Sequence, residues 1–317
     1  MKLVIQIPCY NEEKTIGLTI SKLPREIDGI SKVELLIVDD GSTDRTVEVA
    51  KSCGVDYIVR HPRNLGLAKT FMTGLEASIE VGADIIVNTD ADNQYCADDI
   101  EKLINPILNG TAEIVVGARP IDEIDHFSPS KKCLQKLGSW VVRLISRTDI
   151  DDVTSGFRAI SRKAAMHLNI FDSFTYTLET VIQAGQEGIA IISVPVGVNE
   201  EMRPSRLIKN VPHYIMRSLL TVVRIFMTYK AFRFFSLPGV IIIGLGLLIS
   251  IRFMVFYLTG DGIGHIQSLI LSALLMGAGG GLCVVGLLAD LISVNRKMIE
   301  RINWRMYRIE DHLRDKE

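Results

Sequence analysis

Cysteine is scarce in this sequence, and its spacing is not that of a cysteine-based fold. The five cysteines are an odd number and include no Cys-x-x-Cys pair. A disulfide framework and a zinc site built on paired cysteines are therefore disfavoured, and reduced thiols in a cytosolic compartment fit better.

Several other signatures are missing. No Gly-x-Gly-x-x-Gly occurs, so a dinucleotide-binding domain would lack its fingerprint. We find no internal repeat and no low-complexity stretch. Met1-Lys2-Leu3 leads directly into an apolar run, so we expect no N-terminal signal peptide. We expect no nucleic acid among the partners.

Charge of each sign is concentrated in a different part of the chain. Residues 1–202 carry 20 Lys and Arg against 30 Asp and Glu, whereas residues 203–317 carry 15 against 7. The segment 203–233 contains basic and apolar residues but no acidic one. This composition predicts amphipathic helices in the lipid headgroup layer, with a buried linker helix as the alternative.

The basic half also holds two long apolar runs. Residues 237–258 and 266–289 are each long enough to cross a bilayer core of about 30 Å as helices. The loop between them, 259–265, lacks Lys and Arg, while both outer flanks are basic. By the positive-inside rule, we expect both termini and the soluble domain on the cytoplasmic face of a plasma or endoplasmic-reticulum-type membrane.

The first two hundred residues alternate between strand-like apolar runs and amphipathic stretches of helical length. This pattern predicts an α/β domain with a mainly parallel sheet covered on both faces. The expected organisation is a globular domain over 1–205, amphipathic helices over 206–236, a membrane hairpin over 237–289 and a tail over 290–317. A further amphipathic helix is expected at 131–146, and the tail is expected to form a short interfacial or self-associating helix. The predicted strands are 3–7, 34–39, 57–60, 85–89, 113–118 and 189–196.

The most informative pair of residues is Asp90 and Asp92, which directly follow one of these strands. Carboxylates one residue apart at the carboxyl edge of a sheet suit a hard divalent cation such as Mg²⁺ or Mn²⁺. A solvated turn is the alternative, because Asp is common in turns. Three other polar segments also follow predicted strands, and all four are expected to face one crevice. The three other segments are residues 8–13, 39–44 and 64–68.

This order of segments resembles the family-2 glycosyltransferases of the GT-A fold, and more narrowly the polyprenyl-phosphate (dolichyl-phosphate) hexose synthases. The resemblance covers residues 1 to about 210. It implies a metal site at Asp90, Asp92 and, more weakly, Gln94, which would hold the diphosphate of a GDP- or UDP-linked sugar. The nucleotide-sugar contacts that it implies are Pro8, Tyr10, Glu12, Asp39, Asp40 and Asp90.

The resemblance also bears on the acceptor. Processive relatives carry a Gln-x-x-Arg-Trp segment, and no such segment occurs here. A phosphate monoester is already ionised at neutral pH and needs cations rather than a general base. The candidate cations are Arg119, Lys136, Arg203 and Arg206, and lipid headgroup contact is the alternative for each. Catalytic roles are expected for Asp90, Asp92, Arg119 and Arg203.

The expected function is inverting transfer of mannose, glucose or N-acetylglucosamine to polyprenyl or dolichyl phosphate at a membrane surface. One rival is a transferase that extends a lipid-linked oligosaccharide, with Glu179 as its base. Another is a non-catalytic membrane scaffold. Arg158 is either a sugar contact or a structural anchor. The Gly277 to Gly281 segment permits close helix packing and a homo-oligomer.

Overall fold

The computed structural model describes residues 1–120, 139, 142–143, 146–170, 176–199, 223, 227, 231–260 and 266–314. The chain divides into two compact units, Met1–Ser218 and Leu219–Glu317. The predicted helix at 131–146 and the amphipathic segment that follows residue 205 lie largely outside the described residues.

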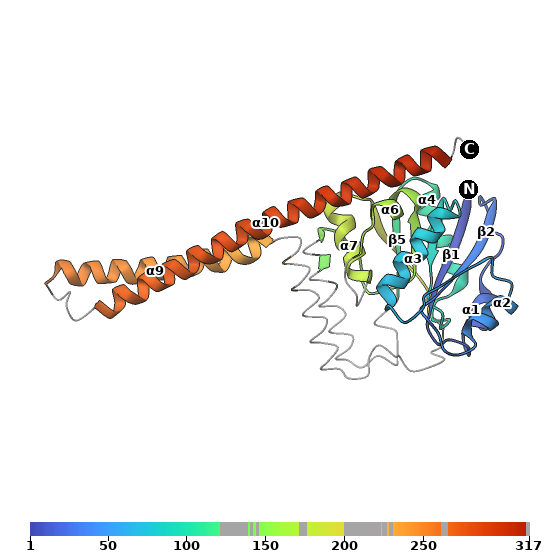
Figure 1. Cartoon of the computed structure of the whole chain (residues 1–317), viewed down its shortest axis with the longest axis horizontal. Helices are drawn as coiled ribbons and strands as arrows, with labels where there is room; N and C mark the ends of the chain where they lie inside the picture. Colours follow the sequence, from blue (N-terminus) through green and yellow to red (C-terminus); the bar gives the residue numbers. More distant parts are fainter. Residues whose placement is uncertain are drawn as a thin grey trace. The chain divides into compact units, whose positions relative to one another are not determined.

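The first unit is built on one mixed sheet. Its strands stand in the order β3-β2-β1-β4-β6-β5-β7. Figure 1 shows β1 and β2 side by side in this sheet. The pairs of β1 with β2, β1 with β4, β2 with β3 and β5 with β7 are parallel, which confirms the mainly parallel sheet. The strands are β1 (Lys2–Cys9), β2 (Lys32–Asp39), β3 (Tyr57–Arg60), β4 (Ile85–Asn88), β5 (Ile114–Ala118), β6 (Arg158–Ser161) and β7 (Ile191–Pro195).

β6 is absent from the strands predicted from the sequence. This strand runs antiparallel to both β4 and β5 and closes the gap between them. It is four residues long and begins with Arg158, which is fully buried. A charged residue at the start of so short a run gives no apolar period, so the pattern predicts no strand here.

Helices cover both faces of the sheet. Alternate β1 residues from Leu3 to Cys9 pack with apolar residues of α1 (Ile16–Lys22), α2 (Thr46–Ser52) and α4 (Ile100–Leu108). The short 3-10 helix η1 (Ala97–Asp99) leads into α4. On the other face lies α3 (Leu67–Glu80), whose Phe71 stacks on Tyr176 of α7 (Tyr176–Glu187) with ring centroids 3.9 Å apart. The remaining helix of this unit, α6 (Arg162–His167), follows β6 and is capped by the Ser161 hydroxyl.

The strand order contains a switch point beside β1. From β1 the chain first adds β2 and β3 on one side, and then returns to place β4 on the other side. The connections that leave β1 and β4 therefore separate at their carboxyl ends, and open α/β sheets bind ligands in the crevice formed there. Tyr10 follows β1 and Asp90 follows β4, so the fold brings these two predicted site residues to one crevice.

The second unit consists of two long helices, α9 (Ala231–Leu258) and α10 (Ile266–Arg314). Within them, 231–258 and 266–295 are each long and apolar enough to cross a membrane. The structure differs from the predicted boundaries at both ends. The first helix already begins at Ala231, and the second continues without a break through the predicted tail, to a length of 49 residues. No Gly or Pro follows Gly286, so the backbone has no residue that would end the helix there.

Small residues allow α9 and α10 to approach closely. A Cβ added at Gly239 would lie 2.8 Å from the Gly279 carbonyl oxygen, and one added at Gly246 would lie 3.1 Å from that of Ser272. Ser250 and Ser272 also share a hydrogen bond between the two helices. By contrast, Cβ atoms added at Gly277 and Gly281 would meet nothing within 4 Å among the described residues, so this predicted packing pair faces away from α9.

Candidate active site

The two acidic residues after β4 stand on a loop that is fixed by the helices around it. The carbonyl oxygen of Ala91, between them, accepts a hydrogen bond from the Thr19 hydroxyl at 3.0 Å. The Asp92 carboxylate accepts the backbone N–H of Gln94 at 3.3 Å, and Asn93 has a φ of 57°. Asp90, Asp92 and Gln94 are half-buried, so they are held in place and still reach solvent.

Beneath Asp90 lies a glycine that leaves room for its carboxylate. A Cβ added at Gly156 would lie 2.9 Å from Asp90 Oδ1 and 2.9 Å from the Tyr176 hydroxyl. The side-chain amide of Asn88 donates to the Gly156 carbonyl oxygen at 2.7 Å and to the Tyr176 hydroxyl at 3.0 Å. Gln6 completes this floor by donating to Asn88 Oδ1 at 2.9 Å.

Tyr176 and Tyr95 flank Asp90 as neutral phenols. Burial, together with the negative charge of Asp90, raises the pKa of Tyr176 well above its ordinary value. Burial raises the pKa of Tyr95 to about 12, and its hydroxyl oxygen accepts the backbone N–H of Gly156 at 3.0 Å. Both phenols therefore remain protonated at neutral pH and add no negative charge beside the carboxylates.

Arg119, a predicted phosphate ligand, is locked in a buried ion pair. Its Nε lies 2.6 Å from Asp152 Oδ2, and its Nη2 donates to Asp152 Oδ1 at 3.2 Å and to the Thr154 hydroxyl at 2.9 Å. Burial opposes the charged form of Arg119, but Tyr95, Asp152 and Asp90 outweigh it, and the guanidinium pKa is raised. The arginine therefore presents a permanent and oriented charge within electrostatic reach of Asp90.

Arg158 is a structural anchor in this fold. It is fully buried, and its guanidinium donates at 2.9 Å to the carbonyl oxygens of Ser155 and Val153. Its guanidinium carbon also lies 5.7 Å from the centre of the Tyr176 ring. These contacts hold the turn that presents Gly156 to Asp90.

The end of β1 and the turn after it carry three of the predicted nucleotide contacts. Pro8 is buried within the strand, whereas Tyr10 is 39% exposed at the edge of the sheet. Glu12 is buried and accepts the Thr15 hydroxyl at 2.9 Å. Between them, Asn11 has a φ of 54° and accepts the Thr43 N–H at 2.8 Å, so it ties this turn to the loop after β2.

Asp39 ends β2 with no exposed surface. It accepts the backbone N–H of Ser42 at 3.1 Å and pairs with Arg60 Nε at 3.1 Å. The register sets Asp39 opposite Cys9, so it stands next to the turn that bears Tyr10. Burial and the surrounding acids raise the pKa of the Cys9 thiol, which favours its neutral form.

Asp40 organises the loop between β3 and α3. Its two oxygens accept the backbone N–H groups of Leu65 at 2.8 Å and Gly66 at 2.9 Å, at the start of α3. His61 Nδ1 lies 2.9 Å from the same carboxylate. A nucleotide contact for Asp40 stays a prediction. In the structure, the Asp40 carboxylate accepts hydrogen bonds from the loop between β3 and α3.

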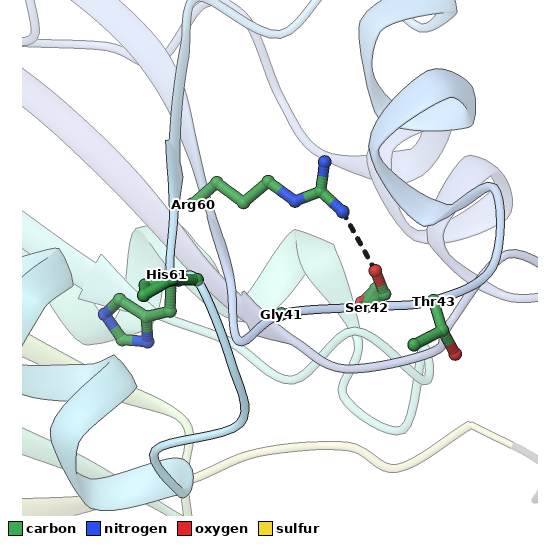
Figure 2. A pocket seen from close by; sticks show the side chains of 6 residues that line it. Gly41, Ser42, Thr43, Arg60 and His61 are labelled. Carbon is green, nitrogen blue, oxygen red and sulfur yellow. Dashed lines mark hydrogen bonds between the residues drawn. The ribbon is translucent and has the colours of Figure 1, made fainter.

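A pocket of about 500 Å³ opens between these loops, beside the ends of β2 and β3. Figure 2 shows Arg60 extended toward Ser42, whose carbonyl oxygen accepts Arg60 Nη2 at 3.0 Å, while His61 points to the other side of the loop. Glycine is required at position 41, because its φ is +74° and a Cβ there would lie 2.6 Å from the Arg63 carbonyl carbon. The lining residues are Gly41, Ser42, Thr43, Arg60, His61 and Pro62.

The donor set can be tested for its fit to a metal. Among the described residues, no three His, Cys, Asp or Glu side chains form a cluster that could hold a metal ion. Two half-buried carboxylates, of which Asp90 lies over Gly156, instead suit a cation that takes its remaining ligands from water and a diphosphate, as Mg²⁺ and Mn²⁺ do. Asp90 and Asp92 therefore fit the metal predicted for them.

Not every predicted site residue can be placed. Lys136, Arg203 and Arg206 lie outside the described residues. Glu179, the base required by the oligosaccharide rival, is buried in α7 with 4% of its surface exposed. Sequence reasoning gave no site role to Gln6, Asn88, Arg60 or His61. For Gln6 and Asn88 a signal did exist, because each is a polar residue inside an otherwise apolar buried strand.

Known proteins resemble this chain in sequence. A UDP-N-acetylglucosamine–dolichyl-phosphate N-acetylglucosaminyltransferase of Methanococcus voltae is 35% identical over 177 residues, which cover 50% of this chain and 68% of that protein. An undecaprenyl-phosphate mannosyltransferase of Micrococcus luteus is 25% identical over 218 residues, which cover 65% and 88%.

A solved structure of glucosyl-3-phosphoglycerate synthase from Mycobacterium tuberculosis, in complex with Mn²⁺ and UDP, has a TM-score of 0.54 at 20% identity. The similarity covers 70% of this chain and 79% of that chain, and it shows the GT-A fold. The family model described as Glycosyl transferase family 2 matches residues 4–168. This chain belongs to glycosyl transferase family 2.

Proposed function

We propose that the chain transfers a hexose from a GDP- or UDP-linked donor to a polyprenyl or dolichyl phosphate at a membrane surface. The observation that carries the proposal is the placement of Asp90 over Gly156, with Asp92 two residues further on, at the switch point of the sheet, in a chain with two helices fit to cross a membrane. Relatives named for transfer to dolichyl or undecaprenyl phosphate support the acceptor class.

The donor would occupy the crevice at the ends of β1, β2 and β4. Tyr10 offers an exposed ring beside Asp39, and the pocket lined by Arg60 opens on the same edge. Asp90 and Asp92 would hold Mg²⁺ or Mn²⁺, with Gln94 as the weaker third candidate. When bound, the cation supplies positive charge that stabilises the departing diphosphate.

The reaction is a single displacement. An oxygen of the lipid phosphate attacks the anomeric carbon, the bond from that carbon to the diphosphate oxygen breaks, and the nucleoside diphosphate leaves with the bonding electrons. One displacement at carbon inverts its configuration. Because the acceptor is already an anion, no side chain has to remove a proton from it.

Cations must hold that anion in line. Arg119 is suited to this task, because Asp152 and Thr154 fix its guanidinium and burial limits its motion. Lys136, Arg203 and Arg206 are the further candidates for the acceptor phosphate. Basic residues flank the two apolar helices on their outer sides, whereas the loop between them, 259–265, has no Lys or Arg. This distribution supports insertion as a hairpin with the first unit on the cytoplasmic side.

The deciding experiment is transfer by the full chain in detergent. Radiolabelled GDP-mannose, UDP-glucose and UDP-N-acetylglucosamine are offered with dolichyl or undecaprenyl phosphate, with Mn²⁺ or with a chelator. We expect one donor to give a lipid product in the presence of metal, and Asp92→Asn to reduce its formation at least about 100-fold, since even groups that only support metal ligands contribute 10–100-fold.

Asp98→Asn is the matched control, because Asp98 lies on the same connection and is exposed. Transfer to a sugar hydroxyl but not to a lipid phosphate, abolished by Glu179→Gln, would replace the proposal with the oligosaccharide rival. Absence of metal-dependent nucleotide binding would favour the scaffold.

A further inference from the structure

The cytoplasm-facing part of α10, as the proposed topology has it, carries a seven-residue repeat that neither the fold nor the proposed reaction uses. Apolar residues alternate at spacings of three and four, interrupted only by Asn295. This is the a and d pattern of a coiled coil. Position a is occupied by Val285, Ile292, Ile299, Met306 and Leu313, and position d by Leu288, Asn295, Ile302 and Ile309.

The described side chains of this stripe are unusually exposed for their size. Ile292 is 69% exposed, Ile299 59% and Ile302 56%. The stripe also lies away from α9. Gly279 and Gly286 are the residues of α10 that approach α9 closely. The d position Leu288, and Gly281 one heptad before it, each follow one of these glycines by two positions. Two positions on a helix correspond to about 200°.

The helix cannot hide this stripe by lying down on a membrane. The apolar span ends at Asn295, and α10 continues to Arg314, a further length of about 30 Å. Sharp bends in helices occur at Pro, Gly or local defects, and no Pro or Gly follows Gly286. A straight continuation carries Ile299 and Ile302, which follow the apolar span, out of the bilayer into water, where an apolar stripe requires a cover.

A second copy of the chain is the cover that the sequence fits. Two copies inserted with the same topology present their α10 helices in parallel, so identical a and d residues meet. The flanking charges agree, because Arg305 takes a g position and Glu310 the following e position, which are neighbours across a parallel pair. Asn295 interrupts the apolar stripe at one d position.

We propose that residues 285–313 form a parallel two-stranded coiled coil with the same segment of a second copy. The proposal rests on insertion of the hairpin in the membrane, as proposed above, but not on the identity of donor or acceptor.

Cysteine crosslinking of the full chain in membranes tests the contact. Ile302→Cys places a thiol at a d position, and Lys297→Cys places one at the f position on the opposite side of the same helix. We expect an oxidant to convert the Ile302→Cys chain to a covalent dimer several-fold faster than the Lys297→Cys chain. The native cysteines are common to both variants. Equal rates, or no dimer from either variant, would overturn the proposal. Such a result would indicate that the helix lies on the membrane or on its own chain.

Light scattering of the chain in detergent tests the stoichiometry. Two chains per particle are expected, with a fall to one chain for the double variant Ile299→Asp and Ile302→Asp and no change for Lys297→Asp. Three or four chains, or a dimer that survives the double variant, would overturn the two-stranded coil. Nucleotide binding measured on the same samples is expected to persist, which separates loss of the coil from failure of the proposed function.

Discussion

At the scale of single residues, Gly156 is the position where one added methyl group reports on the site. In the Gly156→Ala variant, the new Cβ would lie 2.9 Å from Asp90 Oδ1 and from the Tyr176 hydroxyl, so the carboxylate has to move. We expect transfer to fall about tenfold to a hundredfold, since misplacements of this size have such effects on catalysis. Steady-state rates at varied metal and donor concentrations measure it, with the loss concentrated in the apparent affinity for metal and donor.

The control is Gly17→Ala in α1, where the Cβ would make an ordinary contact of 3.4 Å with Val49. This variant should keep near-normal activity. An equal loss in both variants would show that Gly156 has no special relation to Asp90.

A second prediction for a single residue concerns the contribution of the Asp152 carboxylate to the stability of the fold. Only 1% of its side chain is exposed, and removal of one partner of a buried ion pair costs about 3 kcal/mol or more. Asp152→Asn should lower the midpoint of thermal unfolding by about 6–12 °C at neutral pH. The neighbour Asp151, whose side chain is 74% exposed, gives the control Asp151→Asn.

The pH dependence of that loss has a definite sign. Burial opposes ionisation of Asp152, but Arg119 and Thr154 outweigh it, and the pKa of Asp152 is lowered. Its contribution to stability is therefore present above the ordinary Asp pKa of about 3.9 and disappears as the pH falls through the lowered value. Unfolding midpoints of Asp152→Asn and the native chain should converge in acid. A gap that is constant with pH would contradict this role.

Part of this site could be predicted from local sequence and part could not. Asp90 and Asp92 directly follow an apolar strand, so their place at the edge of the sheet follows from neighbouring residues. The pair of Arg119 with Asp152 joins residues 33 positions apart, and Asn88 meets Tyr176 across 88 positions. No periodicity in the sequence encodes such contacts, because they depend on the insertion of β6 beside β4.

At the scale of elements, the close approach of α9 and α10 predicts which glycines are sensitive. Gly239→Leu would bring a side chain to within 2.8 Å of Cys283 Sγ and the Gly279 carbonyl oxygen, so the helices must separate. We expect a destabilisation of about 1–3 kcal/mol, as is typical of overpacking. Thermal unfolding in detergent measures it, and faster alkylation of Cys283 would mark the opened interface.

Gly244→Leu on the same helix is the matched change, because a Cβ there meets nothing within 4 Å among the described residues. It should leave both readouts unaltered. The sequence predicted a packing role for the Gly277 to Gly281 segment, and only Gly279 within it faces α9. Composition identifies a small-residue segment, but only the three-dimensional arrangement shows which of its faces has a neighbour.

At the scale of the whole molecule, the predicted order of parts agrees with the structure where residues are described. An α/β unit comes first and two apolar helices follow, as the change in composition indicates. The exact ends were harder to predict, because α9 and α10 extend beyond their purely apolar runs into residues such as Arg233 and Asp290 that are compatible with a helix. The ends of the helices in the structure depend on helix propensity, whereas the ends of the predicted membrane spans depend on hydropathy alone.

The order of strands in the sheet has a consequence for how the chain can be made. β1, β2, β3 and β4 are all contained in residues 2–88 and form one contiguous parallel block, and only β6, β5 and β7 require later residues. Closure of short loops is fast, and domains fold during synthesis from the N-terminus onward. The block that leads to Tyr10, Asp39 and Asp90 can therefore assemble on the ribosome before the first of the two long apolar helices has been translated.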